Sequence, residues 1–336
     1  MHSIRVALIG FGGIARIHNN AYNQLAREGY PVELVAVCEK NVESVRQAVK
    51  INLGTDNEPL AEGVRVYGDV DELLQNEEFE LADVCLPTFL HKEISVKLLE
   101  AGKHVICEKP MALSSSDCAE MVETAKKLNR RLMIGQCLRF DHCYLYLKKC
   151  MDEKLFGEVK YVTMHRLSEY PRWSPAFADL ERTGGCILDT HIHDIDVARM
   201  IFGEPRSVSA LAYNKMPFCQ VVNSRLYYDG FSVIADCCWD ESREKPFEAG
   251  FRAIFENATV VSDGENVKIF ENGKEPYAAN LTPTDRIKDE IAHICNLIAN
   301  PEAEDSHNPP ESAYMSVKLI ERLKESASLG GARITL

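Results

Sequence analysis

The stretch Ile4-Arg-Val-Ala-Leu-Ile9 runs directly into Gly10-Phe-Gly-Gly-Ile-Ala15. The first six residues form an apolar run of strand length, and the next six have the form G-x-G-x-x-A. In this pattern the first glycine makes a tight turn, the second lets a phosphate approach the backbone, and the third small residue lets helix and strand pack closely. The helical segment that follows, residues 15–26, offers free N–H groups to an anion. We therefore expect a strand–turn–helix unit that binds the pyrophosphate of a dinucleotide through Gly10, Phe11, Gly12, Gly13 and Ile14.

The next apolar run, residues 33–37, ends in Cys38-Glu39-Lys40. Glu39 takes the place of the acid that the fingerprint has about 20 residues past its glycines. A carboxylate there accepts hydrogen bonds from the ribose hydroxyls and repels a 2′-phosphate, which favours NAD over NADP as the cofactor. The neighbouring Lys40 keeps NADP binding open, and a solvated charge at a strand end is the alternative interpretation of Glu39.

Strands and helices alternate through the first 137 residues. The expected strands are residues 4–9, 33–37, 64–67, 81–86, 105–109 and 132–136, and the expected helices include 15–26, 42–49, 91–99 and 114–128. Asp69 and Glu72 have the spacing of a helix cap and its third residue. Near-continuous apolar strands separated by helices indicate a parallel sheet covered on both faces. The sequence predicts an α/β fold with a dinucleotide-binding domain at residues 1–137.

A charged pair ends one of these strands. In Gly102-Lys-His-Val-Ile-Cys-Glu108-Lys109-Pro110 the apolar run delivers a carboxylate and an ammonium to its carboxyl end. Ligands of open α/β sheets bind outside the carboxyl ends of strands. A proline also restricts the residue before it to extended conformations, so Lys109 is expected to have a fixed direction. An ordinary surface pair is the alternative.

The second half of the chain has a different pattern. Strand-like runs rich in β-branched and aromatic residues lie at 159–165, 207–212, 221–228, 231–239, 251–255, 259–261 and 267–270, with turn signals between them. This spacing predicts a large, mainly antiparallel sheet in a second α/β domain, residues 138–336. Two carboxyl-terminal helices are expected, one capped at Thr282 and running to Ala299 and one at 312–328. Packing of these helices back on the first domain is left open.

Gly184-Gly185 opens a helical pattern that contains Asp189, His191 and His193 and reaches Phe202. Residues four apart on a helix share one face, so Asp189 and His193 would lie together. A histidine beside a carboxylate can take a proton from a hydroxyl near neutral pH. A simple surface hydrogen bond is the bland alternative. A metal site of Asp189, His191 and His193 would need an irregular first turn, so we expect His191 to be a packed structural histidine and no metal site.

Composition excludes several classes of protein. The 336 residues suffice for two domains, and the net charge of −13 argues against a nucleic-acid or anionic-membrane partner. The 12 cysteines include no C-x-x-C pair, so neither a zinc ribbon nor a disulfide framework is expected. Without a signal peptide or a long apolar span, the sequence indicates a cytoplasmic protein.

The chain resembles the Gfo/Idh/MocA oxidoreductases in four segments that follow one another in the family's order. These are the Gly10–Ala15 loop, Pro87-Thr88-x-x-His91, Ala101–Val105 leading into Glu108-Lys109-Pro110, and Gly184-Gly185 leading to Asp189-x-x-x-His193-Asp194. The resemblance implies a Rossmann domain, a second domain with a large sheet, and hydride exchange between a nicotinamide and the CH–OH group of a sugar, polyol or inositol. It implies a small-molecule, carbohydrate-like substrate and a homodimer or homotetramer.

The resemblance also implies roles for individual residues. Lys109 would hydrogen-bond the reacting oxygen, His193 would act as general acid and base, and Asp189 would hold a substrate hydroxyl. Pro87, Thr88, His91, Glu108 and Lys109 would contact the cofactor. Arg139 is a candidate substrate contact, and Trp173 is either a platform for a sugar ring or a loop anchor.

His191 stands where many members of this family have glycine, so no particular substrate is carried over. Two alternatives remain at this stage: a non-catalytic dinucleotide-binding sensor, and a relative that uses its cofactor for redox-assisted elimination or glycoside cleavage.

Overall fold

A computed structural model describes residues 3–47, 58–172, 177, 179–213 and 220–336. The chain divides into two compact units. The first contains residues 1–112, 116–137 and 285–314, and the second contains residues 113–115, 138–284 and 315–336. Residues 285–314 therefore interrupt the second expected domain, 138–336, and join the first unit. Each unit is described by itself below.

The first unit is built on a six-stranded parallel sheet with the order β3-β2-β1-β4-β5-β6. Its strands are β1 (Ile4–Ile9), β2 (Val32–Cys38), β3 (Arg65–Tyr67), β4 (Leu81–Val84), β5 (His104–Glu108) and β6 (Leu132–Gly135). The strand order reverses between β1 and β4, which is the switch point at which doubly wound sheets bind ligands. This sheet confirms the predicted parallel α/β fold.

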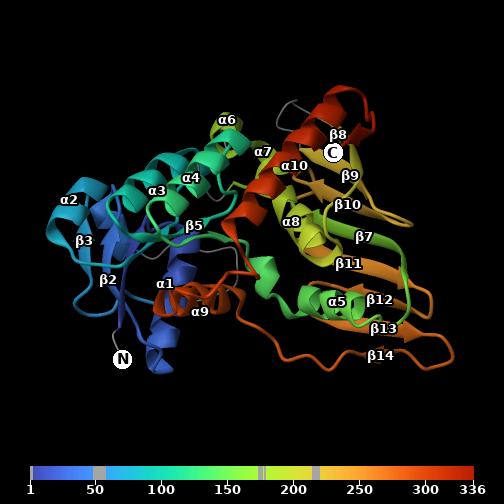
Figure 1. Cartoon of the computed structure of the whole chain (residues 1–336), viewed down its shortest axis with the longest axis horizontal. Coiled ribbons are helices and arrows are strands. Elements are labelled where there is room, and N and C mark those ends of the chain that lie inside the picture. The colour runs from blue at the N-terminus through green and yellow to red at the C-terminus, as the bar shows by residue number, and fades with distance from the viewer. Residues whose placement is uncertain (1–2, 48–57, 173–176, 178, 214–219) are drawn as a thin grey trace. The chain divides into compact units, whose positions relative to one another are not determined.

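Helices cover both faces of this sheet (Figure 1). They are α1 (Gly13–Arg27), α2 (Val70–Asn76), α3 (His91–Glu100) and α4 (Ser115–Lys127), with short 3-10 turns η1 (Val42–Arg46), η2 (Thr88–Leu90) and η3 (Cys137–Phe140). Asp69 caps α2 as predicted, because its side chain accepts a hydrogen bond from the Glu72 N–H. The α-helix predicted at 42–49 was wrong over 42–46, which form a 3-10 turn, and its last two residues lie outside the described residues.

A helix from late in the sequence completes the first unit. Helix α9 (Arg286–Ala299) packs against α1, and its buried Ile291, Ile294 and Cys295 join the apolar core that β1, β2 and α1 share. The predicted cap at Thr282 was wrong. Asp285 caps the helix instead, because its carboxylate accepts a hydrogen bond from the Lys288 N–H, three residues on.

The second unit is built on a nine-stranded sheet with the order β14-β13-β12-β11-β7-β10-β9-β8-β15. Its strands are β7 (Val159–Leu167), β8 (Ser207–Tyr213), β9 (Val221–Tyr227), β10 (Ser232–Cys238), β11 (Glu248–Phe255), β12 (Ala258–Ser262), β13 (Val267–Glu271), β14 (Tyr277–Ala278) and β15 (Ile334–Thr335). Only the pairing of β7 with β10 is parallel among these strands. The sheet confirms the predicted mainly antiparallel domain.

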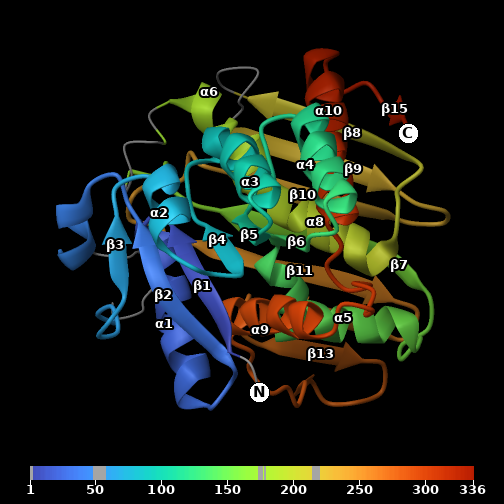
Figure 2. The ribbon, with the colours of Figure 1, turned by 60° about the vertical axis from the view of Figure 1, so that its left-hand side comes forward.

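One face of this sheet is covered by helices (Figure 2). The second unit contains α5 (His142–Asp152), α6 (Leu180–Thr183), α7 (Gly185–Asp189), α8 (His191–Phe202) and most of α10 (Pro310–Ser328). Residues alternate along each strand, so Val222, Val233 and Ala235 are buried against these helices. In the described part of the chain, no helix combines the length and hydropathy needed to span a bilayer.

The opposite face of the sheet, which we call the outer face, carries the alternate residues. Several are large and apolar yet exposed: Leu211 is 45% exposed, Tyr213 is 53% exposed and Phe270 is 41% exposed. Ile234 and Ile254 on this face are partly exposed as well. An apolar sheet face normally lies against another layer, so the outer face has the character of a contact surface.

Candidate active site

The glycine loop leaves room for a ligand at the start of α1. Gly10 has φ +89°, and a Cβ there would lie 2.6 Å from the backbone oxygen of Cys85, so only glycine fits. At Gly12 and Gly13, in contrast, a Cβ would meet no atom within 4 Å. The loop therefore packs closely against the end of β4 at its first glycine and faces open space at the next two.

No side-chain cap covers the amino terminus of α1 among the described residues. Its cap residue, Gly12, makes no side-chain hydrogen bond, and the first turn contains no acid. The first N–H groups of a helix have no partner within the helix and carry the positive end of its dipole. Open space beside uncapped N–H groups fits the pyrophosphate of a dinucleotide.

Glu39, which follows the neighbouring strand β2, forms a hydrogen bond with the glycine loop. One of its carboxylate oxygens accepts the Phe11 N–H at 2.9 Å and the other accepts the Asn41 N–H at 3.0 Å. The side chain is partly exposed, and Lys40 beside it is exposed. Glu39 thus has a fixed place at the carboxyl end of β2, where a cofactor's ribose hydroxyls would meet an acceptor.

The carboxyl end of β5 carries the two charged residues singled out above. Glu108 is 6% exposed; one carboxylate oxygen lies 3.1 Å from Nε2 of His18 and the other accepts the Lys109 N–H at 3.1 Å. Lys109 follows the strand, is partly exposed, and is joined to Pro110 by a cis peptide. Lys109 therefore lies at the same carboxyl edge of the sheet as the glycine loop.

His91 joins two of the loops at this edge. It is 1% exposed, with Nδ1 2.8 Å from the Pro110 oxygen and Nε2 2.7 Å from the Leu86 oxygen. Burial lowers the pKa of His91. The histidine, expected to touch the cofactor, is engaged by backbone carbonyls on both sides and fixes the loops around exposed Pro87 and buried Thr88.

Asp189 and His193 lie in the second unit, on two consecutive short helices. The single helix predicted here was wrong, because Thr190 separates α7 from α8. The Thr190 hydroxyl donates to Asp189 at 3.3 Å and accepts a hydrogen bond from the Trp239 indole N–H at 2.8 Å. Asp189 and His193 are both partly exposed and lie on either side of this break.

His191 points into the second unit. It is fully buried, and its Nε2 lies 2.8 Å from Oγ of Ser224 on β9. Among the described residues, no group close enough to hold a metal ion contains Asp189, His191 and His193 together. His191 is therefore packed against the sheet, as predicted.

Two buried ion pairs hold α8 in place. Arg166 forms an ion pair with Asp194 at 3.1 Å. Arg139 forms a bidentate ion pair with Asp196, at 2.7 and 3.0 Å. Arg139 is only 3% exposed, so its contact with Asp196 favours a supporting role over the expected substrate contact. Trp173, the other candidate substrate residue, lies outside the described residues.

The sequence matches a known family in both units. Residues 4–136 match an oxidoreductase family with an NAD-binding Rossmann fold. Residues 144–261 match the GFO/IDH/MocA C-terminal domain. The chain belongs to the GFO/IDH/MocA oxidoreductase family.

Relatives within the GFO/IDH/MocA family include named dehydrogenases. An uncharacterized oxidoreductase of Schizosaccharomyces pombe is 37% identical over 152 residues, which span 44% of this chain and 40% of that protein. Inositol 2-dehydrogenase of Rhizobium meliloti is 27% identical over 278 residues, 82% of this chain and 75% of that enzyme. A 2,7-anhydro-N-acetylneuraminate hydratase of Mediterraneibacter gnavus is 35% identical over 139 residues, 41% of this chain and 37% of that enzyme.

The fold of GFO/IDH/MocA proteins also extends over the whole chain. Aldose-aldose oxidoreductase from Caulobacter crescentus superposes with a TM-score of 0.84 and 20% identity, covering 100% of both chains. At this identity the likeness establishes the fold.

Sequence reasoning missed a buried polar cluster in the GFO/IDH/MocA Rossmann unit. His18 lies with Nδ1 2.7 Å from Asp83, whose carboxylate also accepts the Tyr22 hydroxyl at 2.8 Å. Burial alone would lower the pKa of His18, but the nearby Asp83 outweighs it and raises that pKa well above its usual value. Glu290 of α9 is fully buried beside the cluster, and neither of its carboxylate oxygens has a hydrogen-bond partner within the described residues. Polar residues on otherwise apolar elements were the available signal.

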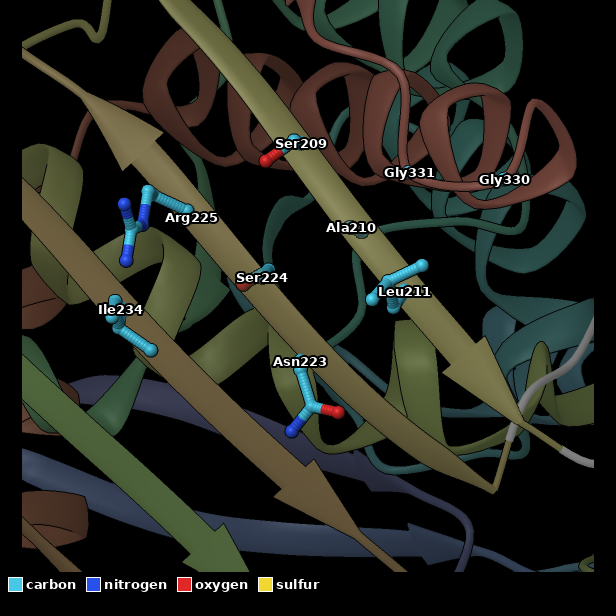
Figure 3. A pocket seen from close by; sticks show the side chains of 9 residues that line it. All are labelled: Ser209, Ala210, Leu211, Asn223, Ser224, Arg225, Ile234, Gly330 and Gly331. Atoms are coloured by element: carbon cyan, nitrogen blue, oxygen red, sulfur yellow. The ribbon is translucent and has the colours of Figure 1, made fainter.

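A surface hollow in the second unit contains none of the expected site residues. It has a volume of about 300 Å³ and lies on the outer face of the sheet (Figure 3). It is lined by Ser209, Ala210, Leu211, Asn223, Ser224, Arg225, Ile234, Gly330 and Gly331. The lining of this hollow therefore gives no support for the predicted chemistry.

The buried Glu290 predicts a pH dependence of stability. Burial, then the charge of Glu108, raise the pKa of Glu290 well above its usual value. As pH rises above about 4.3, the unfolded chain loses this proton first, so the folded state loses stability until its own pKa is passed. Glu290→Gln should remove this loss. The stability of the variant relative to the wild type should therefore grow with pH, by at most about 1.4 kcal/mol per pH unit.

Urea denaturation at a series of pH values measures this difference, with the exposed Glu302→Gln as control. A difference that stays constant between pH 4 and pH 8 would contradict the prediction.

Proposed function

We propose that this protein is an NAD-dependent oxidoreductase that moves a hydride between the nicotinamide and a secondary alcohol or ketone of a sugar, polyol or inositol. The observation that carries the proposal is the shared carboxyl edge of the parallel sheet, where the uncapped start of α1, Glu39 and Lys109 lie. The named inositol 2-dehydrogenase among the relatives supports this substrate class.

In this proposal the cofactor, when bound, supplies the hydride acceptor for alcohol oxidation and the donor for ketone reduction. The Lys109 ammonium donates a hydrogen bond to the reacting oxygen and steadies the negative charge that develops there. His193 takes the hydroxyl proton during oxidation and returns it during reduction. Asp189 accepts a hydrogen bond from a substrate hydroxyl and thereby orients the ring.

Each residue around the cofactor has its own role in this proposal. Gly12, Gly13 and the first N–H groups of α1 hold the pyrophosphate, and Glu39 accepts the ribose hydroxyls. A carboxylate at this place repels a 2′-phosphate, so we propose NAD as the preferred cofactor. His91 positions the loop through its contact with the Pro110 oxygen. Glu108 positions Lys109 by accepting its backbone N–H.

A second candidate function keeps the cofactor but ends in elimination or hydration without net redox change. It is favoured by the relative named as a hydratase. Assays that follow both the absorbance of reduced nicotinamide and the products of a sugar, polyol and inositol panel separate the two functions. Turnover with no net change in reduced nicotinamide would favour the second.

The non-catalytic sensor is the remaining alternative. Lys109, Asp189 and His193 are all present, whereas a sensor has no need of them. Tight NAD binding with no conversion of any panel substrate would favour the sensor.

We expect Lys109→Ala to lower kcat by about 100- to 1,000-fold, because one charged donor to the reacting oxygen is lost. NAD binding, measured by calorimetry, should change by no more than a few-fold. Lys103→Ala is the matched control, since Lys103 lies at the other end of the same strand and donates to the Phe79 oxygen. Near-normal turnover of Lys109→Ala would remove the role proposed for this lysine.

We expect Glu39→Ala to lower kcat/KM for NAD by about 10- to 150-fold, since hydrogen bonds to a charged group contribute about 1.5–3 kcal/mol. The kcat/KM for NADP should rise or stay constant, because the repulsion of a 2′-phosphate is lost. Steady-state kinetics with both cofactors measure the ratio of kcat/KM for NAD to kcat/KM for NADP. The exposed Glu43→Ala serves as control. A ratio unchanged from the wild type would argue against this role of Glu39.

We also propose that the outer face of the second unit pairs with another copy of the chain to give a homodimer or homotetramer. Light scattering should give two or four times the 37.8 kDa of one chain. Leu211→Glu should reduce the mass, because it buries a charge at the contact. Leu155→Glu, at 43% exposure against 45% for Leu211, is the control. A monomeric wild type, or equal masses for both variants, would contradict the proposal.

A further inference from the structure

Two buried thiols face each other inside the second unit. Sγ of Cys186, on α7, lies 3.2 Å from Sγ of Cys237, on β10. Helix α7 packs directly on β9 and β10, and neither cysteine is exposed. The sulfur atoms of a disulfide are about 2.05 Å apart, so an approach of about 1 Å would join this pair.

The hydrogen bonds around His191 fix which of its ring nitrogens carries the proton. The Ser224 hydroxyl donates its single hydrogen to the Ala235 oxygen at 3.1 Å. Ser224 Oγ must therefore accept a hydrogen bond from Nε2–H of His191, 2.8 Å away. In the neutral imidazole Nδ1 then has a lone pair, and this buried atom has no hydrogen-bond partner among the described residues.

The surroundings of Cys237 favour its thiolate. Burial raises the pKa of Cys237, but the hydrogen bond with Cys186 and the nearby His191 outweigh burial and bring that pKa below its usual value. Burial raises the pKa of Cys186 well above its usual value. The two thiols thus differ, because the pKa of Cys237 is lowered while that of Cys186 is raised. A thiolate beside a second thiol is the arrangement in which a sulfenic acid is resolved to a disulfide.

We propose that Cys186 and Cys237 form a redox-active thiol pair that a hydroperoxide converts to a disulfide. His191 Nδ1 takes the Cys237 proton, and the thiolate attacks the peroxide, which breaks the O–O bond and gives Cys237 sulfenic acid. The alkoxide or hydroxide that leaves takes the proton from His191. Cys186 sulfur then attacks the sulfenic sulfur, its proton leaves with the departing oxygen as water, and the S–S bond forms. Two thiols and one hydroperoxide give one disulfide, one alcohol and one water; for hydrogen peroxide the alcohol is a second water.

Disulfide formation would act on the neighbouring α7–α8 turn. Asp189 is the last residue of α7, three residues after Cys186. Drawing α7 toward β10 moves this carboxylate, and a misplacement of about 1 Å can cost about 100-fold in rate. This consequence for turnover rests on the proposed function, whereas the disulfide itself does not.

Peptide mass spectrometry of the full chain tests the pair. The protein is treated with hydrogen peroxide, remaining thiols are alkylated, and the digest is analysed without reduction. We expect a linked peptide that contains Cys186 and Cys237 and disappears after dithiothreitol. Cys186→Ser and Cys237→Ser should lack it. Cys238→Ser, which removes the adjacent and more exposed thiol, should retain it. His191→Leu should form the link at least about tenfold more slowly.

The proposal fails if the wild type yields no linked peptide at peroxide concentrations that oxidise half of Cys238. It also fails if the wild-type linkage joins other cysteines. These two outcomes need only the wild-type protein, so they stand even if a serine variant does not fold.

Turnover is measured in parallel. In wild type and Cys238→Ser we expect a loss of at least tenfold on oxidation and recovery with dithiothreitol, and no such loss in Cys186→Ser. An equal loss in Cys186→Ser would overturn the link to Asp189. A reduced wild type with no turnover, but with the linked peptide, would count against the proposed function and leave the thiol pair standing.

Discussion

A buried histidine between two carboxylates holds the first unit together at its ligand edge. His18 projects from α1 toward Asp83 of β4 on one side and Glu108 of β5 on the other. One side chain therefore fixes the helix that begins at the glycine loop to the two strands whose ends it faces. Removing one member of a buried charged pair typically costs about 3–5 kcal/mol, because the other is left uncompensated. The position of Lys109 depends on this contact, since Glu108 also accepts the Lys109 N–H.

The second unit uses the same principle around the α7–α8 turn. The acids that follow His193 are not surface charges, because Asp194 pairs with Arg166 and Asp196 pairs with Arg139 in the interior. Ser316 of α10 donates a further hydrogen bond to Asp196 at 2.7 Å. Both acids are buried, so their ion pairs fix the position and the rotation of α8. His193, on the same helix, stays partly exposed. Rigid support of this kind is consistent with the catalytic role proposed for His193.

The sequence was most informative where local rules decide the structure. The glycine loop, the parallel strands and the Asp69 cap depend on neighbours within a few residues, and these were predicted from pattern alone. It was least informative where distant segments decide. Asp285 rather than Thr282 caps α9, and Thr190, at the break between α7 and α8, accepts a hydrogen bond from Trp239, 49 residues away. The buried partner of Arg139 is 57 residues away, which no spacing rule could reveal. The roles of Lys109, Asp189 and His193 come from the family resemblance and are a proposal that kinetics will test.

The place of α9 has a consequence for how this chain is made. The core of the first unit includes Ile291 and Ile294, but residues 138–284 are synthesised before them. At about 5–20 residues per second, those residues take roughly 7–30 s to leave the ribosome. During that interval the apolar surface of α1 that α9 later covers has no native partner on the nascent chain. The first unit can therefore complete its apolar core only after most of the second unit has been synthesised.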